Sequence, residues 1–303
     1  MDELIQQLIV GLQAGAVYAL IALGYTMVYG VLRLINFAHG EVYMVGAFTA
    51  LFISRWLQAP AEPTVWKLVA MLVGAMAVCT LLGMSIEYFA YRPLRKQPRI
   101  ASLITAIGVS LFLQNVAILI FPINPPPAIS PNVMPFPPSF SVGAVRVDIG
   151  KMTILAMSVL LMFILRWLVM GTKMGRGMRA ASHDFDAAAL MGVNVNKVVT
   201  FTFAVGSALA GAAAMLNATF LGTTLNNVYG LMPGVKAFVA AVLGGIGNIP
   251  GAALGGMLMG LAETGVSAIG FSNYRDAVAF VILIVVLLLR PGGLLGSAKA
   301  EKV

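Results

Sequence analysis

The sequence has few charged residues and almost no cysteine, and each shortage excludes a class of protein. Only 10% of its 303 residues are Asp, Glu, Lys or Arg, and 60% are hydrophobic. A soluble domain is about a quarter charged, so a soluble protein is excluded. The lone Cys79 excludes an intrachain disulfide. With a mean hydropathy of +0.94, the composition predicts an all-α polytopic membrane protein.

Motifs that carry chemistry are also missing. The sequence contains no G-x-x-x-x-G-K-[ST] loop and no G-x-S-x-G elbow. His39 and His183 stand far apart, without the spacing of metal ligands. We therefore expect no catalytic residues, no metal and no cofactor bound by this chain. The net charge of +8 does not indicate a nucleic-acid partner, because basic residues of membrane proteins collect in cytoplasmic loops.

Long apolar runs predict about seven full transmembrane helices, since a helix needs about 20 apolar residues to cross a bilayer. The runs are 8–28, 37–54, 68–89, 101–121, 152–170, 199–221 and 277–289. The stretch 234–266 differs, because glycines and Pro250 divide it into two apolar halves at 244–251. This favours a broken or re-entrant element, with an ordinary loop between two short spans as the alternative. We treat 1–303 as a single transmembrane domain.

Basic residues alternate between the predicted loops. They gather in 29–36, 90–100 and 171–198, whereas 55–67 and 122–151 hold few. The basic loops are therefore expected in the cytoplasm, together with the C-terminal tail, and the N-terminus outside. The loop 122–151 is then external, and it is rich in proline. We interpret it as a rigid connector, or alternatively as a contact surface for a soluble external partner.

A compact polar segment, MGRGMRAASHDFDAAALMGVNVNK at 174–197, separates two apolar runs. It predicts a short helix in the cytoplasmic loop 171–198, ended by a glycine. Its apolar face is small and mostly alanine, which favours docking in a protein socket over lying on the bilayer. We expect Phe185 to insert into that socket. The residues expected to couple this segment to a partner are Arg176, Arg179, Asp184, Phe185, Asp186 and Gly192.

Polar residues within or beside the spans are candidates for function. The residues considered for a pathway or gate are Asn36, His39, Glu41, Gln114, Gly245 and Asn248. Structural alternatives stand beside this hypothesis. Asn36 would be an N-cap and Glu41 would favour the positive end of the second span. Gln114 would make an interhelical hydrogen bond.

The chain resembles the permease subunit of bacterial branched-chain amino-acid ABC importers. The resemblance runs essentially end to end, and several stretches carry it. They include YALIALGYTMVYG at 18–30, INFAHGEVYMVG at 35–46, IEYFAYR at 86–92, IGVSLFLQN at 107–115, 175–194, VKAFVAAVLGGIGNIPGA at 235–252, and RPGGLLG at 290–296.

This resemblance implies a set of partners. A homologous second permease would complete the membrane pathway, and two cytoplasmic ATPases would bind and hydrolyse ATP-Mg. A periplasmic or surface binding protein would deliver the amino acid. The segment 175–192 would be the coupling loop that sits in a groove of the ATPase. We therefore expect a transporter subunit, not an enzyme, in the bacterial inner (cytoplasmic) membrane.

Other functions remain open at this stage. Related permeases carry urea, short amides or other amino acids. A passive channel or facilitator also contains glycine-rich breaks, but it does not need the segment 174–197. An ion-coupled transporter would show paired broken helices and buried acids, and the sequence shows one clear break. A membrane scaffold would leave the polar residues of the spans unexplained.

Overall fold

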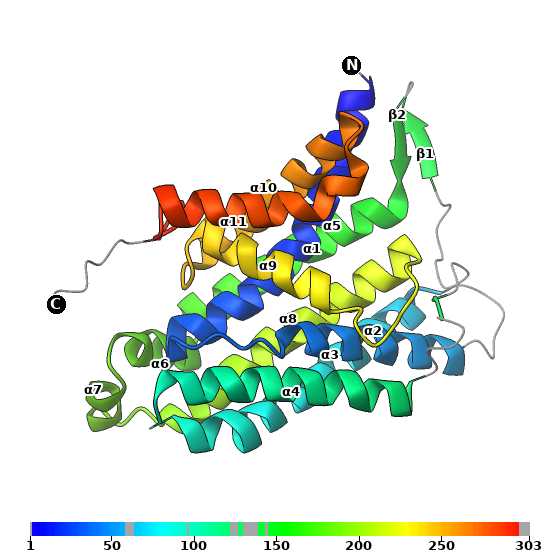
Figure 1. Cartoon of the computed structure of the whole chain (residues 1–303). Helices are drawn as coiled ribbons and strands as arrows, with labels where there is room; N and C mark the ends of the chain where they lie inside the picture. The colour runs from blue at the N-terminus through cyan, green and yellow to red at the C-terminus, as the bar shows by residue number, and fades with distance from the viewer. Residues whose placement is uncertain are drawn as a thin grey trace.

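The computed structural model describes residues 2–57, 64–95, 97–121, 127–129, 139–142 and 145–296. The chain is an all-α polytopic membrane protein, with one small antiparallel hairpin (Figure 1). Its helices and strands are α1 (Asp2–Leu32), α2 (His39–Trp56), α3 (Val65–Ile86), η1 (Glu87–Tyr91), η2 (Arg92–Leu94), α4 (Arg99–Ile120), β1 (Ser139–Val142), β2 (Val145–Asp148), α5 (Ile149–Gly171), α6 (Lys173–His183), α7 (Phe185–Leu190), α8 (Val195–Leu221), α9 (Leu231–Gly244), α10 (Ile249–Ala268), η4 (Ser272–Tyr274) and α11 (Arg275–Leu289).

Within the described residues, six helical segments are long and apolar enough to cross a membrane. They are Ile5–Leu32, Val65–Leu94, Ile100–Ile120, Ile149–Gly171, Val195–Leu221 and Ser272–Leu289. The remaining span expected from the sequence, 37–54, forms the helix α2, most of which is buried inside the protein. Helices α4 and α11 are the opposite case, because few of their residues are covered by the rest of the chain.

Helix α8 lies at the centre of the fold and packs closely against α1, α2 and α3. Its run of small residues makes this possible, as the sequence indicated. Gly211 is an example: a Cβ atom there would stand 2.7 Å from the Ala75 carbonyl oxygen of α3. The alanines 210 and 212–214 are fully buried. Close backbone approach of this kind replaces the hydrophobic driving force that lipid does not supply between helices.

The predicted break in 234–266 is confirmed. Helix α9 ends at Gly244 and α10 begins at Ile249, and the two pack against each other at Gly244 and Gly251. Helix α10 then runs antiparallel to α1, since a Cβ on Gly15 would meet the Met257 backbone and one on Gly30 would meet Gly247. Helix α10 therefore follows α1 along most of its length, whereas α9 has only 14 residues.

A second break, at 33–38, corresponds to the predicted loop 29–36, but the sequence did not predict that it returns into the protein. The segment between α1 and α2 has no helical structure, and Arg33 has a φ of 54°. Helix α2 begins beside α1 at a point before the end of that helix, because the His39 ring lies directly against Gly24. Gly24 precedes the end of α1 at Leu32 by 8 residues, or about 12 Å at 1.5 Å per residue. The chain thus folds back into the protein before α2 starts.

Different secondary-structure elements lie at the two ends of the molecule. The hairpin β1–β2 lies at one end, and α6 and α7 lie at the opposite end (Figure 1). The hairpin occupies the last part of the loop 122–151, and most prolines of that loop lie outside the described residues. The proposed roles of this loop therefore stay predictions.

Candidate functional site

The N-terminal ends of α2 and α9 meet inside the protein. A Cβ on Gly40 would stand 2.7 Å from the Gly230 carbonyl oxygen, and one on Gly230 would overlap the Gly40 carbonyl. Neither helix has a side-chain N-cap. Two helix N-termini with partial positive charge therefore face each other, and only glycine permits this separation.

Glu41 lies in the first turn of α2, at this junction, and is 2% exposed. Its Oε1 accepts a hydrogen bond of 2.7 Å from the Gln114 amide of α4. Its Oε2 has no partner among the described residues, and in the same part of the chain no basic nitrogen lies within 4 Å. The Tyr25 hydroxyl of α1 lies near the same junction, since a Cβ on Gly234 would stand 3.4 Å from it and 3.0 Å from the Gly40 Cα atom. The structure thus brings together two of the predicted pathway residues, Glu41 and Gln114.

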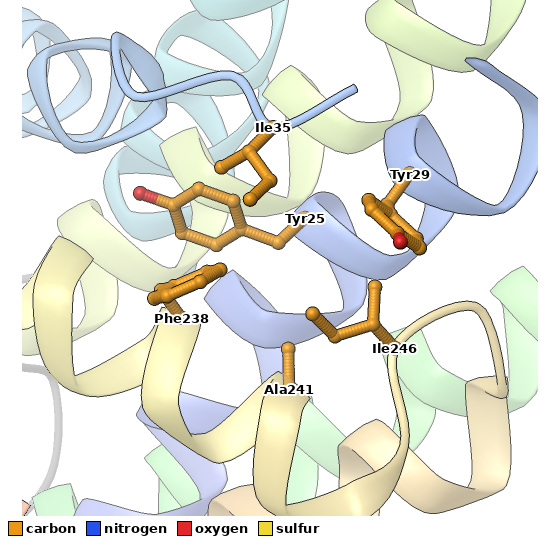
Figure 2. A pocket seen from close by; sticks show the side chains of 6 residues that line it. All are labelled: Tyr25, Tyr29, Ile35, Phe238, Ala241 and Ile246. Atoms are coloured by element: carbon orange, nitrogen blue, oxygen red, sulfur yellow. The ribbon is translucent and has the colours of Figure 1, made fainter. Parts of the chain in front are cut away.

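Aromatic side chains close a pocket near the start of α2. The Tyr25 ring lies 4.7 Å from the His39 ring and 6.0 Å from the Phe238 ring of α9, between centroids. Figure 2 shows Tyr25 and Phe238 facing each other, with Ile35, Ala241 and Ile246 around them. The enclosed space leaves no room for a water molecule.

A wider cleft lies beside this closed pocket. It has a volume of about 340 Å³ and is lined by α1, the segment 33–38 and the start of α4. Tyr29 and Ile35 belong to the linings of both spaces. The two spaces are therefore adjacent and together form a candidate route, which ends short of Glu41 because Glu41 lines neither of them.

Asn36 and His39 are buried beside this route. Asn36 is not the N-cap of α2, which is Ala38, so the capping interpretation was wrong. The Asn36 side chain turns away from the helix and accepts a hydrogen bond of 3.1 Å from the buried Tyr91 hydroxyl. The His39 ring bonds the backbone of Ile21, and its Nε2 has no partner among the described residues.

Gly245 and Asn248 contact the C-terminal segment 290–296, and Ile246 between them lines the closed pocket. The amides of Leu294 and Leu295 bond the carbonyls of Leu243 and Gly244, which satisfies the exposed end of α9. Asn248 is the N-cap of α10, and its amide bonds the Leu295 carbonyl at 2.7 Å. Gly245 has a φ of 105°, where L-residues are strained. The glycine-rich break and the RPGGLLG motif thus form one joint.

A buried ion cluster was missed by the sequence analysis. Lys236 of α9 lies 2.8 Å from Glu263 of α10 and 2.7 Å from Asp276 of α11. The Tyr18 hydroxyl of α1 donates to the other Glu263 oxygen at 2.9 Å. Arg275 stands 3.9 Å from that oxygen. Lys236 and Glu263 are ionisable residues of opposite sign within 234–266, and such residues usually pair.

The polar segment 174–197 forms two helices, α6 and α7, where the sequence predicted one. Asp184 separates them as the N-cap of α7, and its Oδ1 accepts from the Asp186 and Ala187 amides. Arg179 donates to the Val169 carbonyl near the end of α5. Gly192 follows α7 with a φ of 82° and ends the segment as expected. Arg176 and Asp186 are exposed.

The apolar face of this segment points into its own protein. Met178 and Ala181 are buried, and Phe185 is half-buried against the core. The apolar side chains that do protrude are Leu190 and Met191, which are 88% and 85% exposed. A pair of large apolar residues directly before a glycine was the signal in the sequence that would have identified them.

A buried ion pair connects the π-helical turn η1 to the start of α8. Glu87, fully buried, pairs with Arg95 and accepts a hydrogen bond of 2.7 Å from Thr200 of α8. Arg95 also donates to Asn196 at 2.7 Å. Burial lowers the pKa of the Arg95 guanidinium, and the Glu87 carboxylate opposes that shift. The contact joins η1, a π-helical turn, to the start of α8.

Comparison with known proteins gives one consistent result. A family model described as "Branched-chain amino acid transport system / permease component" matches residues 7–287. The chain is 44% identical over 311 residues to the high-affinity branched-chain amino acid transport system permease protein LivH of Escherichia coli K12, covering 99% of this chain and 97% of that protein. It is 43% identical to BraD of Pseudomonas aeruginosa, which bears the same description, over 99% of this chain and 98% of that protein. The probable permease protein LivH of Methanocaldococcus jannaschii is 28% identical, over 91% and 88%. No solved structure matches the chain.

Proposed function

Because the chain belongs to the family of permease components of branched-chain amino acid transport systems, we propose that it is the permease subunit of an ATP-driven importer of branched-chain amino acids. The observation that carries this proposal is the identity of 44% to an E. coli permease across nearly the whole of both chains. Permeases for urea, short amides or other amino acids are the alternative within the same class.

The proposed importer contains several subunits in the bacterial inner membrane. A homologous second permease completes the pathway, two cytoplasmic ATPases bind and hydrolyse ATP-Mg, and an external binding protein delivers the amino acid. ATP binding closes the ATPase pair, and the permeases change between inward-open and outward-open states because the ATPases bind one state better than the other.

The proposed pathway passes from the cleft at Tyr29, through the aromatic closure at Tyr25 and Phe238, to the junction at Glu41. Three observations support it. The cleft shares residues with the closed pocket. The non-helical segments before α2 and after α9 supply Ile35 and Ile246 to that pocket. Asn36, His39 and Glu41 are buried. Discontinuous helices that meet within a membrane protein commonly form the substrate sites of transporters. The closed pocket then corresponds to a shut gate.

The proposed coupling surface is the outer face of α6 and α7. Leu190 and Met191 replace Phe185 as the residues expected to enter the ATPase groove, because Phe185 packs against its own chain. Arg176 and Asp186 are exposed beside them and would pair with charges at the rim of the groove. Arg179, Asp184 and Gly192 fix the shape of the segment.

The importer is tested by the ATPase activity of the reconstituted complex. Leucine-loaded binding protein should stimulate hydrolysis, and empty binding protein should stimulate it much less. Stimulation by some other ligand alone would overturn the substrate and keep the architecture. Hydrolysis unaffected by any loaded binding protein would contradict the importer.

The coupling surface is tested with a Leu190→Asp, Met191→Asp double variant. Both side chains are exposed, so the permease should fold normally but lose the ATPases during purification. The matched control is Phe185→Asp, which should lower the thermal stability of the permease because it places a charge against the core. A double variant that retains the ATPases and full uptake would contradict the assignment.

A further inference from the structure

We infer that the Glu41 carboxylate, together with the Gln114 amide, binds the ammonium group of the amino acid during transport. This inference rests on the proposed function and adds the chemistry by which the permease itself recognises its substrate. Two independent features lead to it, and each is a property of the described residues.

The first feature is an incomplete buried carboxylate. Glu41 Oε1 is satisfied by Gln114, but Oε2 has no hydrogen-bond partner and no cation beside it within the described part of the chain. An unpaired buried carboxylate oxygen is costly, because desolvation is not repaid by a bond. The other deeply buried carboxylates, Glu87 and Glu263, do have basic partners. The positive ends of α2 and α9 favour the charged carboxylate, but Oε2 remains an open acceptor for a cation that the described part of the chain does not supply.

The second feature is the position of Glu41 where the N-terminal ends of α2 and α9 meet. Gly40 and Gly230 bring the ends of α2 and α9 together at this point, and Tyr25 connects it to the closed aromatic pocket. An ammonium group held at Glu41 would place an aliphatic side chain near Tyr25 and Phe238. An apolar wall beside one carboxylate matches the two parts of a branched-chain amino acid.

The Gln114 side chain has a second role in this proposal. The Gln114 Nε2 atom donates to Oε1, which leaves the carbonyl oxygen of Gln114 as a second acceptor on the same residue pair. An ammonium group has three donors, so it can bond a carboxylate and an amide oxygen at once. Interactions of this kind are strong, because one partner is charged and water is excluded.

The test is Glu41→Gln in the complete importer, reconstituted with its ATPases and binding protein. Glutamine keeps an oxygen that can accept from Gln114, so the helix contact survives while the negative charge is lost. We expect leucine uptake to fall about ten-fold or more, the loss expected for one charge-assisted hydrogen bond, with ATPase stimulation by leucine-loaded binding protein retained. The matched control, Glu3→Gln, makes the same chemical change at an exposed residue and should leave uptake unchanged.

A second measurement separates recognition from support of the fold. Leucine should protect Glu41 of the native complex, but not Glu263, from reaction with dicyclohexylcarbodiimide, as measured by mass spectrometry. Normal uptake by Glu41→Gln, or labelling of Glu41 that is insensitive to leucine, would overturn the inference while ATPase stimulation upholds the importer. Loss of stimulation in the native complex would instead contradict the proposed function.

Discussion

Removing the charge of Lys236 should destabilise the protein more than removing either of its partners. The Lys236 side chain is 10% exposed, Glu263 is fully buried, and Asp276 is 58% exposed. Lys236→Met leaves Glu263 buried with only the Tyr18 hydroxyl and the more distant Arg275. Breaking a buried ion pair in this way costs about 3–5 kcal/mol.

Removing the charge of Glu263 or of Asp276 should lower the free energy of unfolding less than removing that of Lys236, for a different reason in each case. Glu263→Gln leaves Lys236 paired with Asp276 at 2.7 Å, so the loss should be about 1–3 kcal/mol. Asp276→Asn removes a half-exposed charge, which is worth no more than about 1 kcal/mol. The double variant Lys236→Met, Glu263→Gln should cost less than the sum of the single changes by about 2 kcal/mol, because no unpaired charge remains.

Unfolding of the purified permease, followed by intrinsic fluorescence, measures this order. Lys173→Met is the matched control, since Lys173 is exposed, and it should change the stability little. Additive costs in the double variant, or an Asp276→Asn variant as unstable as Lys236→Met, would refute the argument that burial of Glu263 sets the penalty.

Three further substitutions test the close contacts of the fold by the same unfolding measurement. Gly245→Ala should cost at least about 1 kcal/mol because of its positive φ, whereas Gly108→Ala, with open space around it in α4, should be neutral or slightly stabilising; equal effects would contradict the strain argument. Gly230→Ala should separate α2 from α9 and cost about 1–3 kcal/mol, and a fully stable variant would mean that the two ends do not touch. Glu87→Gln should cost about 3 kcal/mol by leaving Arg95 unpaired, and no loss would contradict the buried pair.

The sequence was sufficient where composition carries the information. The apolar runs predicted the membrane-spanning helices, and glycines with Pro250 predicted the break between α9 and α10. The alanines of 210–214 predicted close packing of α8. These features depend on local chemistry: the length of an apolar run, the backbone freedom of glycine and the small size of alanine.

Features that depend on tertiary contacts could not be predicted from the sequence. The segment 33–38 contains neither glycine nor proline, so nothing local shows that the His39 ring at the start of α2 lies against Gly24 of α1. The pairing of Lys236 with Glu263 joins residues that periodicity alone does not align. Phe185 was expected to insert into a partner's socket, but it is half-buried against its own chain, and its direction depends on how α7 packs against α8. In each case the position of the side chain is set by a distant part of the same chain and not by the local sequence.

The most direct test of the central claim is accumulation of leucine in proteoliposomes that contain the permease pair and both ATPases, with binding protein and leucine outside the membrane. ATP enclosed on the ATPase side should drive leucine above its external concentration, and the gradient should vanish with a non-hydrolysable ATP analogue. Leucine that only equilibrates across the membrane, at the same rate with and without ATP, would identify a passive facilitator and contradict the account.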